Sequence, residues 1–184
     1  QGDGAVNTHD WFMEATAAGI VMQGELLLIS RDKVAIDRYL SKMERAADFI
    51  ETRRDPKTGL YWAGIASNLL APSFAGYLKP DGTRGMAYHA GLQVTYIAAL
   101  DRLVELERLA GRAAEAKKYT ARRDLARQSL SKFVTPDGYF VNSIDPDGTK
   151  HGVFGAAKYG YFESSVNHDA VCFRVADEAL ANSI

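Results

Sequence analysis

Four carboxylates at the borders of apolar segments are the residues of this chain best placed to do acid–base chemistry. Asp10 and Glu14 lie at the start of the first apolar segment, and Glu163 and Asp169 lie near the start of the last one. Paired carboxyl groups can serve as general acid and general base when their surroundings separate their pKa values. We therefore take these four residues as the candidate catalytic groups.

Each carboxylate also has a structural interpretation, which the sequence leaves open. Asp10 and Asp169 stand at the start of helical patterns, where aspartate commonly caps a helix. Glu14 lies in an otherwise apolar turn, and burial there predicts a raised pKa that suits a general acid. Glu163 lies among aromatic residues and glycines in a loop, where it is a candidate base or an acceptor for loop amides.

Aromatic and polar side chains accompany these carboxylates and are candidates for binding a substrate. Aromatic rings offer flat apolar faces to a ligand such as a sugar, although most rings in a protein belong to its core. Histidine at a helix start can orient a carboxylate or a substrate, or can be purely structural. The candidate substrate-binding residues are Trp11, Trp62, Asn68, Tyr88, His89, Gln93, Tyr161 and His168.

The composition argues against several other classes of function. The net charge of -1 gives no attraction to nucleic acid or to an anionic membrane, and no apolar run approaches the roughly 20 residues of a membrane span. No Cys/His cluster has metal spacing, and no phosphate-binding glycine loop or Gly-x-Ser-x-Gly turn is present, so we predict no metal and no cofactor. The run from Asp145 to Thr149 lacks the full ligand series of a calcium loop and is predicted to be a turn. The single cysteine, Cys172, is predicted to be a small buried core residue.

The apolar pattern predicts an all-α protein made of helical hairpins. An almost wholly apolar helix is expected from Trp11 to Ser30, and a charged helix with one apolar stripe follows from Lys33 to Arg53 after a very short link. The same order recurs after roughly 80 residues, with an apolar helix over 88–109 and a charged helix over 113–132. A third apolar helix is expected to start near His168, which gives about two and a half hairpins.

The links between these helices alternate between short and long. The link within a hairpin is a few residues, whereas the segments 55–86 and 135–167 are long, irregular and rich in glycine, proline and aromatic residues. Loops of this length inside a compact domain are uncommon and are often functional. In consecutive antiparallel hairpins, all the long loops lie at the end that holds the N-termini of the apolar helices. We therefore expect the candidate residues to share one cavity at that end.

Three runs, together with the alternation of inner and outer helices, carry a family resemblance. They are Asp-Trp-Phe-Met-Glu-Ala-Thr at 10–16, the helix and turn from Tyr96 to Arg112, and the loop from Tyr161 to Asp169 with its Tyr-Phe-Glu and Asn-His-Asp. In these features the sequence resembles the six-hairpin glycosidase superfamily, the (α/α)6 barrels that include trehalase-like and α-glucosidase-like hydrolases. The resemblance implies part of an (α/α)6 toroid, a carbohydrate substrate and an inverting mechanism with two carboxyl groups about 6.5–9.5 Å apart. Glu14 or Asp10 would then be the acid and Glu163 the base.

The chain is shorter than a complete barrel of this kind, which has six hairpins. Residues 1–184 are therefore expected to be a partial catalytic domain from a longer chain. The predicted partners are a carbohydrate and further segments or chains that complete the ring, with no nucleic acid and no membrane.

Two other functions stay open from the sequence. One is a sugar epimerase, sugar isomerase or polysaccharide lyase on the same toroid, which would depend on His168, His89 or a tyrosine for proton transfer. The other is a non-catalytic helical scaffold that binds a partner. The compartment is undetermined, since periplasmic, secreted and cytoplasmic locations all fit the composition.

Overall fold

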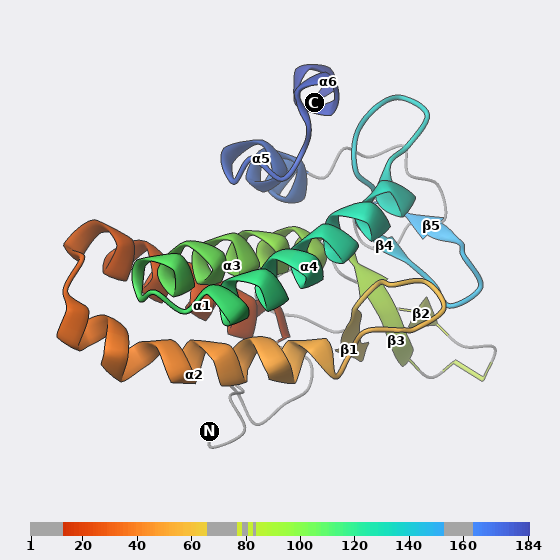
Figure 1. The fold of residues 1–184 in the computed structure, drawn as a ribbon. Helices are drawn as coiled ribbons and strands as arrows, with labels where there is room; N and C mark the ends of the chain where they lie inside the picture. Colours follow the sequence, from red (N-terminus) through yellow and green to blue (C-terminus); the bar gives the residue numbers. More distant parts are fainter. Residues whose placement is uncertain (1–12, 66–76, 79–80, 83, 153–163) are drawn as a thin grey trace.

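The computed structural model describes residues 13–65, 77–78, 81–82, 84–152 and 164–184. Within these residues the protein is mostly helical, with a small antiparallel sheet at one end of the helices (Figure 1). The helices are α1 (Met13–Ser30), α2 (Lys33–Glu51), α3 (Ala90–Leu109), α4 (Ala113–Leu130), α5 (Ser164–Cys172) and α6 (Glu178–Ser183), with a 3-10 turn, η2 (Ser131–Phe133). The strands are β1 (Trp62–Ile65), β2 (Tyr77–Leu78), β3 (Arg84–His89), β4 (Ser143–Ile144) and β5 (Lys150–His151).

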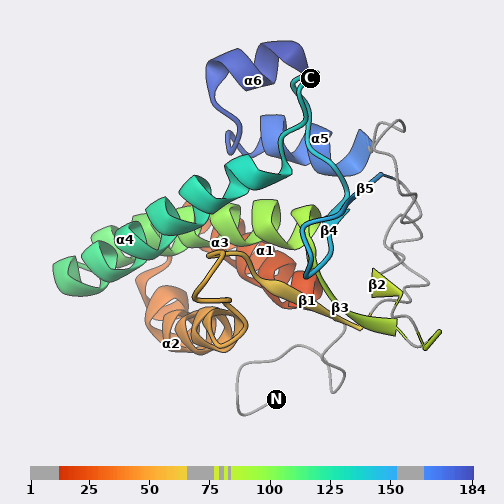
Figure 2. The ribbon, with the colours of Figure 1, turned by 90° about the vertical axis from the view of Figure 1, so that its right-hand side faces the viewer.

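Helices α1 and α3 lie side by side and run in the same direction. Near their N-termini, Oε2 of Glu14 lies 3.3 Å from Nδ1 of His89, the residue that precedes α3. About three turns further along both helices, Nε of Arg102 donates to Oε1 of Glu25 at 2.5 Å. Both N-termini therefore point to the end of the molecule that carries the sheet (Figures 1 and 2).

The second helix of each hairpin runs back beside the first, so α2 and α4 are parallel to each other. Nη2 of Arg112 donates to Oε1 of Glu44 at 2.7 Å, and further along both helices Nη1 of Arg122 donates to Oδ1 of Asp48 at 2.9 Å. Helix α3 is the centre of this arrangement, and every residue from 91 to 100 is buried. The predicted layout of two helical hairpins, with the long connections at the N-terminal end of the apolar helices, is confirmed for these four helices.

Helix α2 shows why the hairpin pattern could be recognised in the sequence. Asp32 caps its N-terminus, because its Oδ1 accepts from the amides of Val34 at 2.9 Å and Ala35 at 3.3 Å. One face carries the predicted apolar stripe, and all of its members are buried: Ile36, Leu40, Met43, Ala47 and Ile50.

The all-α prediction is wrong in one respect, because the two long segments also contribute strands. The sheet has the order β1-β3-β4-β5, and all pairs are antiparallel. Strand β2 pairs with the first residues of β3. In the register across its centre, His89 lies opposite Ser143 and Ser143 lies opposite His151. Strand β3 leads directly into α3, and the amide of Ala90 donates to the carbonyl of Asn142 at 2.9 Å. The sheet therefore fixes the N-terminus of α3.

The last apolar helix differs from the prediction in both position and burial. Helix α5 begins at Ser164 and not near His168, so the Asn-His-Asp run lies in the middle of a helix. Cys172 is exposed at the end of α5, and the prediction that it is a buried core residue is wrong. Asn167 is the buried anchor of this helix, since Oδ1 accepts from the amide of Phe140 at 2.7 Å and Nδ2 donates to its carbonyl at 3.0 Å.

An almost wholly apolar helix is typically enclosed by other elements, but α1 is not enclosed on all sides. Met22, Leu26 and Ile29 are exposed on one face of α1, while Ala17 and Ile20 are buried against its neighbours. The apolar composition of α1 does not make it a membrane helix, because no helix in the described part of the chain is both long and apolar enough to span a bilayer.

Candidate functional site

The end of the molecule that carries the sheet holds a chain of three polar side chains. Nδ1 of His89 faces Oε2 of Glu14 at 3.3 Å, and Nε2 of the same ring faces Oδ1 of Asn142 at 3.3 Å. His89 is 5% exposed and Asn142 is fully buried, whereas the side chain of Glu14 is 40% exposed. The buried histidine and asparagine therefore hold a carboxylate that solvent can reach.

The ionisation of Glu14 differs from the sequence-based expectation. Burial alone would raise the pKa of Glu14, but the hydrogen bond and the electrostatic attraction of His89 outweigh it, and the pKa of Glu14 lies below its ordinary value. The prediction of a raised pKa, suited to a general acid, is therefore wrong. Glu14 is ionised at neutral pH, which is the starting state of a general base.

Gly91 makes room for this pair at the first turn of α3. A Cβ atom at residue 91 would stand 2.8 Å from Oε1 of Glu14 and 2.9 Å from Cε1 of His89, distances too short for any larger residue without a shift of both side chains. The glycine also lets the carboxylate approach the N-terminus of α3, where the helix dipole favours a negative charge. Gly91 is therefore part of the site, although no pattern in the sequence around it marks it as such.

A second carboxylate–histidine pair lies next to the first one on the sheet. Nε2 of His151 makes a short hydrogen bond with Oδ2 of Asp145, and Oδ1 of Asp145 is buried without a hydrogen-bond partner among the described residues. Because His89, Ser143 and His151 are in register, their side chains share one face, with the two histidines on strands roughly 10 Å apart. The Asp145–Thr149 run is a turn as predicted, and only the pairing across the strands shows that Asp145 meets a histidine.

Tyr88 and Trp62 come together, but they do so as parts of the core. Their rings stack with centroids 4.0 Å apart, and the hydroxyl of Tyr88 donates to Oδ2 of Asp55 in a short hydrogen bond. Burial raises the pKa of Tyr88 to about 12, and the Asp55 carboxylate also raises it. Tyr88 is almost fully buried, so it presents no ring face to a ligand, while Trp62 remains half-buried.

Three further candidates have structural surroundings that explain their presence. Gln93 is buried, and its Nε2 donates to the carbonyl of Ala126 at 3.0 Å, which joins α3 to α4. His168 and Asp169 lie on the solvent side of α5, with Nδ1 of His168 3.5 Å from Oδ1 of Asp169 and its Nε2 3.4 Å from Sγ of Cys172. None of these contacts joins the three residues to Glu14 or His89.

The remaining candidates lie outside the described residues: Asp10, Trp11, Asn68, Tyr161 and Glu163. Ser164, which follows Glu163, begins α5, and Asn167 in the same turn of helix is bonded to Phe140 near β4. Among the residues that the structure describes, no group of three or more histidine, cysteine, aspartate or glutamate side chains could hold a metal ion.

The site therefore combines residues that were predicted from the sequence with residues that were not. Glu14 and His89 were both candidates, but for separate roles, and Asn142, Gly91 and the Asp145–His151 pair carry no local signal that would have identified them. Comparison of the sequence with protein-family models finds no match, and comparison with curated proteins finds none either.

Proposed function

We propose that this chain is part of a carbohydrate-active enzyme that hydrolyses a glycosidic bond, with Glu14 as the general base. The observation that carries this proposal is the state of Glu14, which is ionised, accessible to solvent and held by a buried histidine. The resemblance to six-hairpin glycosidases suggests a carbohydrate as the substrate. The proposed active site lies at the end of the hairpins that carries the sheet. The assignment differs from the sequence-based one, in which Glu14 or Asp10 is the acid.

The proposed step is the inverting hydrolysis that two carboxyl groups perform. The Glu14 carboxylate accepts a proton from a water molecule while the oxygen of that water attacks the anomeric carbon. At the same time a second carboxyl group donates a proton to the leaving glycosidic oxygen. The carboxylates proposed for this second role are Glu163 and Asp10, whose positions lie outside the described residues. The bond between the anomeric carbon and the leaving oxygen breaks as the bond to water forms, so the anomeric configuration is inverted.

His89 and Asn142 are positioning residues in this mechanism. A base must keep its carboxylate within hydrogen-bond reach of the water that it activates. The contact of 3.3 Å from His89 fixes one oxygen of Glu14, and the contact of 3.3 Å from Asn142 fixes the ring of His89. The second oxygen of Glu14 is then the one that accepts the proton.

A matched pair of variants tests the role of Glu14. Glu14→Gln keeps the shape of the side chain but removes the base, and general-base catalysis contributes typically 100-fold to 10,000-fold in rate. Glu25→Gln, on the same helix and about three turns away, is the control, because Glu25 forms an ion pair with Arg102 at the other end of the helix from Glu14. Both proteins would be assayed on a panel of disaccharides and aryl glycosides, with NMR detection of the first-formed anomer.

The expected result is loss of hydrolysis in Glu14→Gln and retention in Glu25→Gln, with inverted product. Hydrolysis at an unchanged rate in Glu14→Gln would remove Glu14 from the chemistry. Epimerised but uncleaved sugar, or an unsaturated product, would replace hydrolysis by an isomerase or a lyase on the same fold.

A second candidate function is a non-catalytic helical scaffold, and one observation favours it. Met22, Leu26 and Ile29 form an exposed apolar face on α1, which is typical of a surface that another protein covers. This candidate predicts that Glu14→Gln and Glu25→Gln behave alike in every assay, and that no carbohydrate on the panel is turned over.

A further inference from the structure

A cavity between the last turn of α5 and the helices α1 and α3 lies away from the proposed active site. Its volume is about 550 Å³, and its wall is mostly charged, with Glu25 from α1 and with Asp101 and Glu105 from α3. Glu25 lies about three turns along α1 from Glu14, so this cavity is separate from the Glu14–His89 pair. Sites for small molecules have volumes of about 300–1,000 Å³, which include this one.

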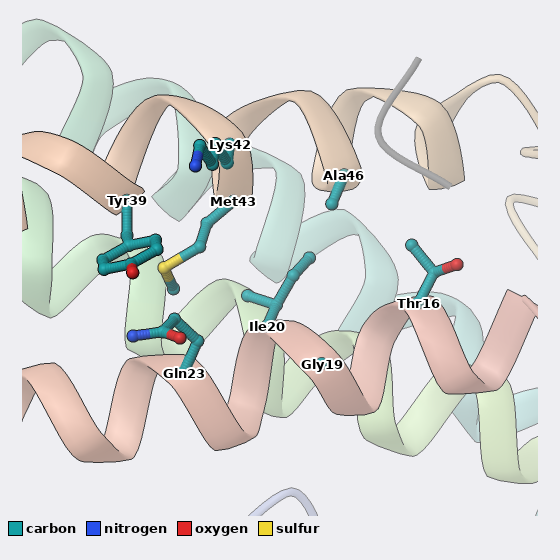
Figure 3. Close-up of a pocket in the computed structure, with 8 residues that line it drawn as sticks. All are labelled: Thr16, Gly19, Ile20, Gln23, Tyr39, Lys42, Met43 and Ala46. Atoms are coloured by element: carbon teal, nitrogen blue, oxygen red, sulfur yellow. The ribbon is translucent and has the colours of Figure 1, made fainter. Parts of the chain in front are cut away.

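The groove between α1 and α2 has a different character (Figure 3). Its volume is about 210 Å³, and the side chains of Ile20 and Met43 point into it. Lys42 is the charged residue on its wall. This groove therefore offers mainly apolar contacts, whereas the cavity beside α5 offers charges to a polar ligand.

Two arginines on the wall of the cavity beside α5 can bind carboxylates through charge-assisted hydrogen bonds. Nε of Arg102 donates to Oε1 of Glu25 at 2.5 Å, and the terminal nitrogens of Arg102 carry further N–H donors. Arg174 follows α5 in a left-handed backbone conformation, with φ of 56°, and Nη1 of Arg127 donates to its carbonyl oxygen at 3.2 Å. Arg127 therefore fixes the backbone from which the Arg174 side chain extends.

The acidic residues of the cavity differ in how far they are already neutralised. Asp101 accepts from Nη1 of Arg123 at 3.0 Å and from Nη2 of Arg127 at 2.8 Å. Glu105 and Arg174 are exposed, and neither side chain has an ion-pair partner within the part of the chain that the structure describes. The cavity therefore presents a carboxylate and a guanidinium group that complement a ligand with both an ammonium group and a carboxylate.

Cys172, the single cysteine of the chain, is exposed and stands on the wall of the same cavity. Its Sγ lies 3.4 Å from Nε2 and 3.8 Å from Nδ1 of His168, which is one turn earlier on α5. Nδ1 of His168 lies 3.5 Å from Oδ1 of Asp169. A nucleophile beside a base that a third group orients is the arrangement of an activated thiol. The last turn of a helix disfavours a thiolate, so the activation depends on His168 and on the arginines of the cavity.

We propose that this cavity binds a small disulfide built from amino acids, and that Cys172 exchanges with it to form a mixed disulfide. The carboxylates of the ligand lie against Arg102 and Arg174, and its ammonium group lies against Glu105. The cavity is then a site of covalent modification, and this role does not depend on the proposed hydrolase activity.

The exchange needs no oxidant other than the disulfide itself. His168 accepts the proton of the thiol, and the thiolate sulfur of Cys172 attacks one sulfur of the ligand. The bond between the two ligand sulfurs breaks as the new S–S bond forms. The other half of the ligand leaves as a thiolate and takes the proton from His168. One disulfide bond replaces another, so the electrons balance.

Rates of mixed-disulfide formation on the full chain, followed by intact-mass spectrometry, test this proposal. Two disulfides would be compared: glutathione disulfide, which carries carboxylates and ammonium groups, and bis(2-hydroxyethyl) disulfide, which is uncharged. The ratio of their rate constants would be measured for the folded protein and for the protein unfolded in urea. The unfolded chain has no cavity, so it gives the intrinsic ratio of the two disulfides with the same thiol.

In the folded protein, we expect the ratio to favour glutathione disulfide at least about tenfold more than in the unfolded chain. Arg174→Gln should lower this ratio at least about fivefold and leave the rate with the uncharged disulfide unchanged, because it removes a ligand contact and keeps the base. Arg45→Gln removes the same charge from the exposed side of α2, outside the cavity, and should leave both rates unchanged. His168→Gln should slow the reaction with both disulfides at least about tenfold.

Equal ratios in the folded and the unfolded protein would overturn the proposal, because the cavity would then not select the ligand. The same effect of Arg174→Gln and Arg45→Gln on the ratio would also overturn it. Unchanged rates in His168→Gln would show that the histidine does not activate Cys172, which overturns the exchange step. Both Arg174 and His168 are exposed, so their replacement is expected to leave the fold intact, and circular dichroism checks this.

Discussion

Replacing Glu107 by glutamine is expected to stabilise the protein at pH 8 and to leave its stability unchanged near pH 4.5. Glu107 is fully buried near the C-terminal end of α3, and neither of its carboxylate oxygens has a hydrogen-bond partner among the described residues. Its Oε2 lies 3.3 Å from Nε of Arg112, but Arg112 also binds Oε1 of Glu44 at 2.7 Å. Burial raises the pKa of Glu107, and the nearby carboxylate of Glu44 raises it further, to about 7.

The sign of the effect follows from proton binding in the two states. Between pH 4.5 and about 7 the native protein holds a proton on Glu107 that the unfolded chain has released, so the free energy of unfolding falls as the pH rises through this window. The full shift corresponds to roughly 3 kcal/mol. The side chain of Glu44 is 15% exposed, so solvent screens the charges of this cluster and reduces the effect. We therefore expect Glu107→Gln to raise the free energy of unfolding at pH 8 by roughly 2 kcal/mol.

Urea unfolding of the two proteins at pH 4.5 and pH 8 measures this difference. Glutamine imitates the protonated acid, because its amide can donate to Glu44 without carrying a charge. Glu105→Gln is the control, since Glu105 lies on the same helix and is exposed. An equal gain at both pH values would refute the reasoning. A loss at pH 8 would also refute it and would mean that Arg112 holds Glu107 in its charged form.

Three further variants test the site and its support. His89→Ala removes the partner that opposes burial at Glu14, so the pKa of Glu14 should rise and the acidic limb of the kcat/KM profile should move to higher pH. Gly91→Ala places a methyl group 2.8 Å from the Glu14 carboxylate, so kcat should fall at least about tenfold. The Tm should change little, because alanine is a better helix former than glycine by up to about 1 kcal/mol. Asn167→Ala leaves the backbone amide and carbonyl of Phe140 without partners and should cost about 2–4 kcal/mol in urea unfolding; a loss below about 1 kcal/mol would mean that water replaces the amide.

The hairpins could be predicted from the sequence because their information is local. The stripe of α2 repeats at helical spacing and has a capping aspartate, Asp32, ahead of it, so both its existence and its buried face were predicted. Helix α1 is apolar on all sides, and such a pattern does not show which face is covered. The exposure of Met22 and Ile29 therefore had no signal in the sequence of α1 itself.

The sheet and the site depend on contacts between distant residues, which spacing does not show. Strands of two residues, such as β4 and β5, are too short to display an alternating pattern. Glu14 and His89 are each visible as polar residues at helix starts, but their contact exists only because α1 and α3 run parallel in register. The pKa of Glu14 was predicted in the wrong direction for the same reason, since the burial was visible and the partner was not.

The groups expected to affect stability and the groups proposed for catalysis lie at opposite ends of the hairpins. The short link between α3 and α4 lies beside the buried Glu107 and its neighbours Glu44 and Arg112, whereas the sheet end holds Glu14 over Gly91. Along α3, residues 91 and 107 are roughly 24 Å apart at 1.5 Å per residue. Effects at sites so far apart with no shared partner usually add within about 0.5 kcal/mol. Glu107→Gln should therefore stabilise Gly91→Ala by the same amount as it stabilises the unmodified chain, without restoring its activity. A Glu107→Gln variant that also shifts the acidic limb of the pH profile would show instead that the two ends are coupled through α3.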